Sequence, residues 1–166
     1  SHGLKDASSD PDTVSAWWER WPEANIGIRT GEDSGLLVLD VDSREAAEGL
    51  KGKIPPGALE QTTGRGYHVL FKHPGFKVKN STSEIGPDID VRGDGGYIVA
   101  PPSIHANGKR YTWKTEGEPQ EAPEWLLDLL RNGKRAESQE APEPAPTIVT
   151  LQSPHSPAAW NSWTAP

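Results

Sequence analysis

The sequence predicts an α+β domain in which short antiparallel strands outnumber helices. Runs of apolar and β-branched residues alternate with polar turns that contain glycine, a spacing typical of antiparallel strands. Helical periodicity is confined to the two ends of this pattern and to one segment between strands. The strands that we expect cover residues 25–30, 36–42, 67–72, 89–92, 97–100 and 110–114.

Two of the turns predict hairpins. The polar segment 31–35 is bounded by glycines, so the strands 25–30 and 36–42 on either side of it are expected to pair. The Asp94-Gly95 pair favours a tight turn, which predicts a second hairpin between 89–92 and 97–100.

The first helix is predicted over residues 10–21. Asp10 suits the N-cap, and Pro11 suits the first helical position. The apolar residues of this segment repeat at helical spacing, and we expect them to pack into the core; the alternative is that they stack on bases. They are Val14, Trp17, Trp18 and Trp21.

Two further helices and a tail complete the predicted organisation. Ser43 can cap a short helix that reaches Leu50, and residues 123–132 form an amphipathic pattern stopped by Gly133. We therefore expect one folded domain over residues 1–133 and a Pro-rich linker or tail over 134–166, with one strand at 147–152.

Composition limits the function classes. The formal net charge of −7 argues against a protein that only coats nucleic acid, because such proteins are usually basic. The absence of cysteine excludes disulfides, thiolate zinc sites and cysteine nucleophiles. No apolar run is long enough to span a bilayer, so we expect a cytoplasmic protein with no membrane partner.

The run LLVLDVD at 36–42 places two carboxylates after a buried strand. Asp40 and Asp42 share one face of that strand, about 7 Å apart at the backbone. Such a pair is costly near a core unless a cation joins it, and Mg²⁺ prefers oxygen ligands of this kind. The alternative is a strand that ends in solvent, with Asp42 or Ser43 capping the next helix.

The run TTGRGYHVLF at 62–71 predicts a site for phosphate. Gly64 and Gly66 can bring backbone N–H groups close to an anion, and Arg65 adds a charged fork. His68 then lies within an apolar strand, on the face opposite to Tyr67. The alternative is an ordinary core histidine, which loses weight if this strand borders the acidic one.

The run DIDVR at 88–92 supplies a third carboxylate. Asp90 and Arg92 alternate with apolar residues, so one side of the strand is charged. Beside Asp40 and Asp42, Asp90 would complete a two-metal site. The alternative is a solvent-facing strand with a cross-strand salt bridge.

The order of these motifs resembles that of the N-terminal domains of bifunctional DNA primase/polymerases, which plasmids, phages and prophages encode. NIGIRTG, LLVLDVD, the glycine turn before a strand histidine, DIDVRGDGGYIVAPPSIH and the PEWLL segment follow one another from about residue 6 to residue 130. The resemblance implies an archaeo-eukaryotic primase-like catalytic core, with an RNA-recognition-motif-like antiparallel sheet and flanking helices.

The resemblance also implies residue roles. Asp40, Asp42 and Asp90 would hold two Mg²⁺ or Mn²⁺ ions, and His68 would contact the phosphates of an incoming nucleotide, with Gly64, Arg65 and Gly66 beside it. The expected function is a template-directed primase/polymerase that transfers nucleotides from nucleoside triphosphates to a primer 3′-hydroxyl. Single-stranded DNA, a primer and a linked helicase are the expected partners, in a bacterial or archaeal cell.

Two departures from the family qualify this expectation. Relatives begin with another strand and helix before the equivalent of residue 6, and those that prime carry a helical domain after the core. We therefore expect primer extension rather than efficient initiation. The rival functions are a metal-dependent nuclease or phosphoesterase, and a degenerate nucleotide- or DNA-binding module of a replication helicase.

Overall fold

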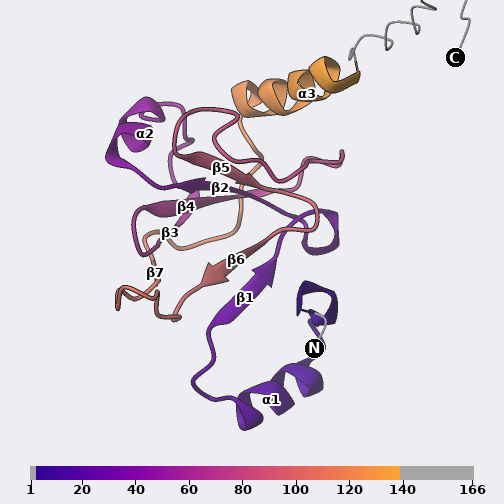
Figure 1. Cartoon of the computed structure of the whole chain (residues 1–166), viewed down its shortest axis with the longest axis vertical. Helices are drawn as coiled ribbons and strands as arrows, with labels where there is room; N and C mark the ends of the chain where they lie inside the picture. The colour runs from indigo at the N-terminus through magenta and orange to yellow at the C-terminus, as the bar shows by residue number, and fades with distance from the viewer. Residues whose placement is uncertain (1–2, 139–166) are drawn as a thin grey trace, which may run out of the picture.

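The computed structural model describes residues 3–138 and has the predicted α+β architecture (Figure 1). Strand formation follows the apolar runs, and Asp10 and Ser43 cap the first two α-helices as expected, with side chains that accept from Thr13 and Ala46 N–H. In chain order the elements are η1 (Gly3–Asp6), α1 (Pro11–Arg20), β1 (Ile26–Arg29), η2 (Glu32–Ser34), β2 (Leu36–Val41), α2 (Arg44–Gly49), β3 (Leu59–Thr62), β4 (Tyr67–Lys72), β5 (Ile89–Arg92), β6 (Tyr97–Ala100), β7 (Thr112–Trp113) and α3 (Glu124–Ser138).

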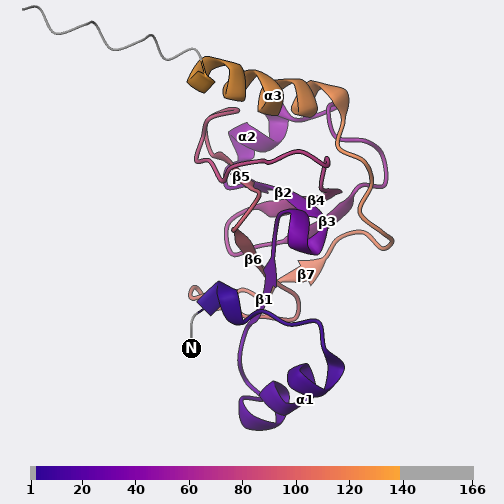
Figure 2. The same ribbon diagram turned by 90° about the vertical axis from the view of Figure 1, so that its right-hand side faces the viewer.

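The main sheet has the strand order β5-β2-β4-β3-β7, and each neighbouring pair is antiparallel. A second sheet consists of β1 and β6, which also pair in antiparallel fashion. Both views show α2 and α3 on one side of the main sheet and the β1–β6 sheet on the other (Figures 1 and 2). The acidic strand β2 is therefore an inner strand of the main sheet.

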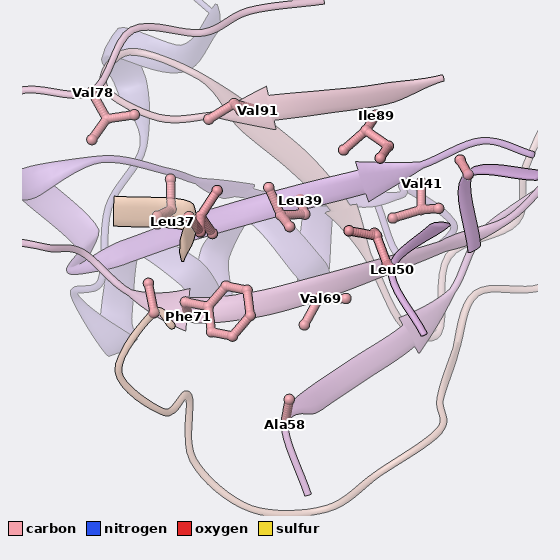
Figure 3. Packing of buried hydrophobic residues seen from close by; sticks show 13 residues of the cluster. Leu37, Leu39, Val41, Leu50, Ala58, Val69, Phe71, Val78, Ile89 and Val91 are labelled. Atoms are coloured by element: carbon pink, nitrogen blue, oxygen red, sulfur yellow. The ribbon is translucent and has the colours of Figure 1, made fainter. Parts of the chain in front are cut away.

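The larger core lies between the main sheet and the helices α2 and α3. Alternate residues of β2, β4 and β5 point toward it, and Leu126 of α3 is fully buried against them (Figure 3). Because side chains alternate along a strand, the residues between these point to the opposite face. The strand residues in this core are Leu37, Leu39, Val41, Val69, Phe71, Ile89 and Val91.

A smaller apolar cluster joins the two sheets on the opposite face. Val38, Leu59 and Leu70 of the main sheet pack with Ile98 of β6, and Ile28 of β1 covers them in part. The face of β2 that carries Asp40 is thus apolar near the start of the strand and polar near its end. Within residues 3–138 no helix is long and apolar enough to cross a membrane.

Both predicted hairpins are wrong. β1 pairs with β6 rather than with β2, and only an isolated bridge between Gly31 and Leu36 links the first two strands. β5 pairs with β2 rather than with β6. The cause is the strand β2, which is apolar on both faces at its centre and therefore takes an inner position with β4 and β5 on its two edges.

The predicted turns still occur, but they connect strands of different sheets. Asp94 in the second turn accepts backbone N–H groups from Glu32 and Val78, so its carboxylate ties three connecting segments together. β3 and β4 form a hairpin across the turn 63–66, whereas the other strand pairs join segments distant in sequence, which local turn residues do not specify.

The predicted packing of the first helix is also wrong. No residue of α1 is buried, and Trp21 at its end is 51% exposed. The helix lies beyond the β1–β6 sheet, away from the face that α2 and α3 cover (Figures 1 and 2). Because those two helices fill the large core, the tryptophan face of α1 has no place in it.

Three elements differ from the prediction in presence or length. The strand β3 was not predicted, and β7 is shorter than the expected 110–114. The helix α3 does not stop at Gly133 but continues to Ser138, since a glycine inside a helix costs only about 1 kcal/mol relative to alanine. The predicted strand 147–152 and the rest of the expected tail, 139–166, lie outside the described residues.

Candidate active site

A row of polar residues crosses the main sheet on the face opposite α2 and α3. In the strand register, Asp40 of β2 lies opposite Asp90 of β5 on one side and His68 of β4 on the other. The row continues from His68 to Gln61 of β3 and from there to Trp113 of β7. Directly opposed residues of antiparallel strands have close side chains, so residues far apart in the sequence meet here.

The predicted acidic cluster forms at one end of this row. Asp40, Asp42 and Asp90 each offer a carboxylate oxygen, and these oxygens lie within 4.8 Å of one another. Asp40 and Asp90 are mostly buried, whereas Asp42, one residue past the end of β2, is exposed. An all-oxygen donor set of three carboxylates fits the preference of Mg²⁺ and Mn²⁺.

Arg92 lies against the same carboxylates. Its Nη2 donates to Asp40 Oδ2 and to Asp90 Oδ2, at 3.0 Å in each case. The cross-strand salt bridge that we considered as an alternative to a metal site is therefore present together with the acidic cluster. A cation that binds here has to share these oxygens with the guanidinium or displace it.

The surroundings shift the two β2 carboxylates in opposite directions. Burial raises the pKa of Asp40, but the hydrogen bonds from His68 and Arg92 and the charge of Arg92 outweigh it and hold the pKa below its ordinary value. Burial, followed by the charges of Asp40 and Asp90, raises the pKa of Asp42. Both oxygens of Asp40 thus have protein partners, whereas the side chain of Asp42 has none among residues 3–138, and the charges of Arg65 and Arg92 offset the rise in its pKa only in part.

The strand histidine joins the cluster as expected. His68 is 5% exposed, and its Nε2 lies 3.1 Å from Asp40 Oδ1. Its other ring nitrogen, Nδ1, lies 2.8 Å from Gln61 Nε2. The strand that carries it borders the acidic strand β2 along its whole length, which is the condition under which an ordinary core histidine becomes a poor explanation.

Close packing explains the two glycines of the turn 63–66, which the sequence did not indicate. A Cβ on Gly66 would lie 1.8 Å from the carbonyl oxygen of Val41, and one on Gly64 would lie 2.2 Å from the ring of His105. Thr63 Oγ1 accepts the N–H groups of Arg65 and Gly66, so those two donors already have a partner within the turn. The role of this turn in binding nucleotide stays a prediction.

A cleft of about 220 Å³ opens beside the acidic cluster. Arg65, exposed to solvent, lines it from the glycine turn. Two aromatic residues that sequence reasoning missed, His105 and Tyr111, line it from the segment after β6. The full lining is Asp40, Asp42, Thr63, Gly64, Arg65, His68, His105 and Tyr111.

Hydrogen bonds hold the loop after β6, which carries His105. Asn25 binds both backbone groups of Ile104, and Asn107 N–H donates to His105 Nδ1 at 3.1 Å. The signal that could have revealed this residue is the glycine- and proline-rich run 93–103, which ends just before it.

The order of the sequence motifs agrees with a family comparison. The sequence profile described as bifunctional DNA primase/polymerase, N-terminal, matches residues 1–125 of the 166. The chain belongs to this family. No curated protein matches the sequence.

In this member of the family, the fold brings together most of the residues chosen from the sequence. Asp40, Asp42, Asp90, His68 and Arg65 all lie at one cleft or at the row beside it. Sequence reasoning missed Gln61, which lies on a strand that was not predicted, and His105 and Tyr111, which lie in the segment after β6.

Proposed function

We propose that the chain is a template-directed polymerase that transfers nucleotides from nucleoside triphosphates to the 3′-hydroxyl of a primer. Membership in the primase/polymerase family implies nucleotidyltransferase-type activity in general. The observation that carries the finer proposal is the cleft of about 220 Å³, which Asp40 and Asp42 of the acidic cluster line together with Arg65 and His68. Carboxylates and phosphate-binding groups that line one cleft suit a triphosphate with its cations.

Asp40, Asp42 and Asp90 are the residues that would hold divalent cations, with Mg²⁺ or Mn²⁺ as the proposed ions. Such cations supply positive charge that lowers the pKa of a primer hydroxyl and neutralises charge on the triphosphate. Asp90 is buried and Asp40 is partly buried, and contacts with Arg92 and His68 hold their oxygens in place. Asp42 is exposed and carries an unmatched charge, which makes it the most available ligand of the three.

Arg65 and His68 are the residues to which we assign the phosphates. The guanidinium of Arg65 is exposed at the rim of the cleft and can form paired hydrogen bonds with phosphate oxygens. His68 faces the same space from β4 and is held by contacts on both ring nitrogens. Fixed donors of this kind stabilise charge that develops during phosphoryl transfer.

We also propose that the core is related to the RNA-recognition-motif sheet. The supporting feature is the connectivity β2–α2–β3–β4–β5 combined with the spatial order β5-β2-β4-β3. A ferredoxin-like βαββαβ unit arranges its strands in this order. The segment 73–88 before β5 carries no helix, which is the difference from that unit.

One observation favours a second candidate, a binding module without catalysis. Arg92 already compensates the charges of Asp40 and Asp90, so a protein donor occupies oxygens that a metal site needs. Each carboxylate oxygen has a second lone pair, however, and the side chain of Asp42 has no hydrogen bond or ion pair among residues 3–138, so the three ligands remain able to accept a cation.

The experiment is a primer-extension assay with Mn²⁺ and an annealed, end-labelled primer on a DNA template, with and without triphosphates. A polymerase lengthens the primer only when triphosphates are present. A nuclease shortens the DNA in both reactions. A binding module retains the oligonucleotide in a gel-shift assay but leaves its length unchanged, and this result would contradict the proposal.

A further inference from the structure

Gln61 is a fully buried polar residue at the centre of the row across the sheet. It is 0% exposed, lies on β3, and stands directly opposite His68 in the strand register. Its Nε2 donates to the carbonyl oxygen of Val99 at 2.6 Å and lies 2.8 Å from His68 Nδ1. Val99 belongs to β6, so the side chain of Gln61 reaches from the main sheet to the second sheet.

The contact with Val99 determines how the amide is oriented. A carbonyl oxygen only accepts hydrogen bonds, so the NH₂ end of Gln61 has to face it. The reversed amide would place two acceptors 2.6 Å apart. The Oε1 atom consequently has no hydrogen-bond partner among the described residues, although it is buried.

The orientation of the amide in turn determines which ring nitrogen of His68 carries the proton. The second N–H of the same NH₂ group points at His68 Nδ1, which therefore accepts and carries no proton. In a neutral imidazole the proton then lies on Nε2. That N–H faces Asp40 Oδ1 at 3.1 Å, so the hydrogen bonds run from Val99 through Gln61 and His68 to the acidic cluster.

We infer that Gln61 is a positioning residue, which holds His68 in the Nε2–H tautomer and aims that N–H at the acidic end of the cleft. His68 then serves the site as a hydrogen-bond donor to a carboxylate or phosphate oxygen rather than as a proton acceptor. The buried and unpaired Oε1 costs stability, so sheet packing alone does not explain a glutamine here. The catalytic consequence rests on the proposed function, whereas the tautomer does not.

The direct test is NMR of the metal-free protein labelled with ¹⁵N, at a mildly alkaline pH and without nucleotide. A scalar coupling across the hydrogen bond between Gln61 Nε2 and His68 Nδ1 is expected, with the Nδ1 signal of an unprotonated nitrogen. The His68→Phe variant assigns the ring signals. A proton on His68 Nδ1, or no coupling to the Gln61 amide, would overturn the inference.

The second test is kinetic and uses a double-mutant cycle. Gln61→Leu is expected to lower kcat/KM for primer extension about tenfold, as loss of an outer partner of a site histidine typically does. In a His68→Ala background the same change should have no further effect, because Gln61 acts through His68. Thr62→Val, a substitution of the neighbouring strand residue, serves as the control for sheet stability.

The outcomes separate the inference from the proposed function. If Gln61→Leu lowers kcat/KM equally in both backgrounds, or only lowers the melting temperature as Thr62→Val does, Gln61 is merely structural and the inference fails. If the NMR couplings appear but the wild-type chain extends no primer, the tautomer assignment stands and the proposed function fails.

Discussion

Asp40 and Asp42 lie two residues apart, yet their carboxylates have different surroundings in the fold. Asp40 accepts from Arg92 and lies 3.1 Å from His68 Nε2, whereas Asp42 sits at the end of the strand beside two other carboxylates. In the proposed cation site, Asp40 would be the ligand held in place by the protein, and Asp42 would be the ligand whose charge is largely unmatched until a cation binds.

This difference predicts opposite effects on the metal-free protein. Asp40→Asn leaves the buried partners of Asp40 poorly paired and should lower the free energy of unfolding at neutral pH by about 1–3 kcal/mol. Asp42→Asn removes an uncompensated charge and should raise it, by less than about 1 kcal/mol because the side chain is exposed. Urea unfolding in the presence of EDTA measures both changes.

The pH dependence has the sign that the pKa shifts require. The folded-state pKa of Asp42 is raised, so its destabilising charge is present at neutral pH and disappears as the pH falls toward the ordinary value of 3.8. The advantage of Asp42→Asn should vanish over the same range. The pKa of Asp40 is lowered, so its contribution persists until the pH falls below 3.8. Equal effects of the two substitutions would contradict this account.

Arg92 occupies the position of a cation between Asp40 and Asp90. We predict that Arg92→Leu raises the affinity for Mn²⁺ several-fold, because a unit charge about 4 Å away opposes an entering cation by several kcal/mol before screening. The same substitution should lower the stability of the metal-free protein. Isothermal titration calorimetry and unfolding in EDTA measure the two effects.

The matched control for this substitution is Arg131→Leu. Arg131 is paired with Glu124 within α3, on the other side of the main sheet (Figure 1). Arg131→Leu should change neither the affinity for Mn²⁺ nor the structure of the acidic cluster. Weaker Mn²⁺ binding by Arg92→Leu would mean that Arg92 orients the carboxylates rather than competing with the cation.

At the scale of elements, the glycine turn joins β3 to β4 by close packing against β2. Gly66→Ala would force a Cβ into the carbonyl oxygen of Val41, next to the first carboxylates of the site. We predict a loss of about 1–3 kcal/mol in unfolding free energy. Gly49→Ala in α2 has open space around its Cβ and should instead stabilise by about 0.5–1 kcal/mol.

Thermal and urea unfolding of these two alanine variants measure the contrast. If Gly66→Ala is as stable as the wild type, the turn is looser than the contacts require. Its glycines would then be explained by access for an anion, as the sequence alone suggested.

Element types were more predictable than their partners. The apolar runs in 36–42 and 67–72 predicted β2 and β4, and the caps Asp10 and Ser43 predicted the starts of two helices. The hairpin predictions failed because turn residues determine only local geometry. A strand that is apolar on both faces is buried inside the sheet, where it pairs with strands distant in sequence. The strand β3 was missed because Glu60, Gln61 and Thr62 are polar.

At the scale of the whole molecule, the site depends on register. Asp90, Asp40, His68 and Gln61 come from four strands and meet only because the pairing aligns them in one row. The sequence motifs indicated the first three, since their residue types are unusual in apolar strands. No unusual residue type indicated Gln61 in the sequence, because its role depends on His68, the residue opposite it in the strand register.

We propose that the acidic cluster binds the divalent cations that support nucleotide addition. Asp42 tests it best, because its loss should not unfold the protein, and Asp128→Asn on α3 removes an equal charge far from the cluster. The measurement is primer extension as a function of Mn²⁺ concentration for the wild type and both variants. We predict that Asp128→Asn extends the primer like the wild type, while Asp42→Asn, folded and stable, extends it only at background level. Extension by Asp42→Asn at the wild-type rate and the wild-type Mn²⁺ dependence would contradict the account.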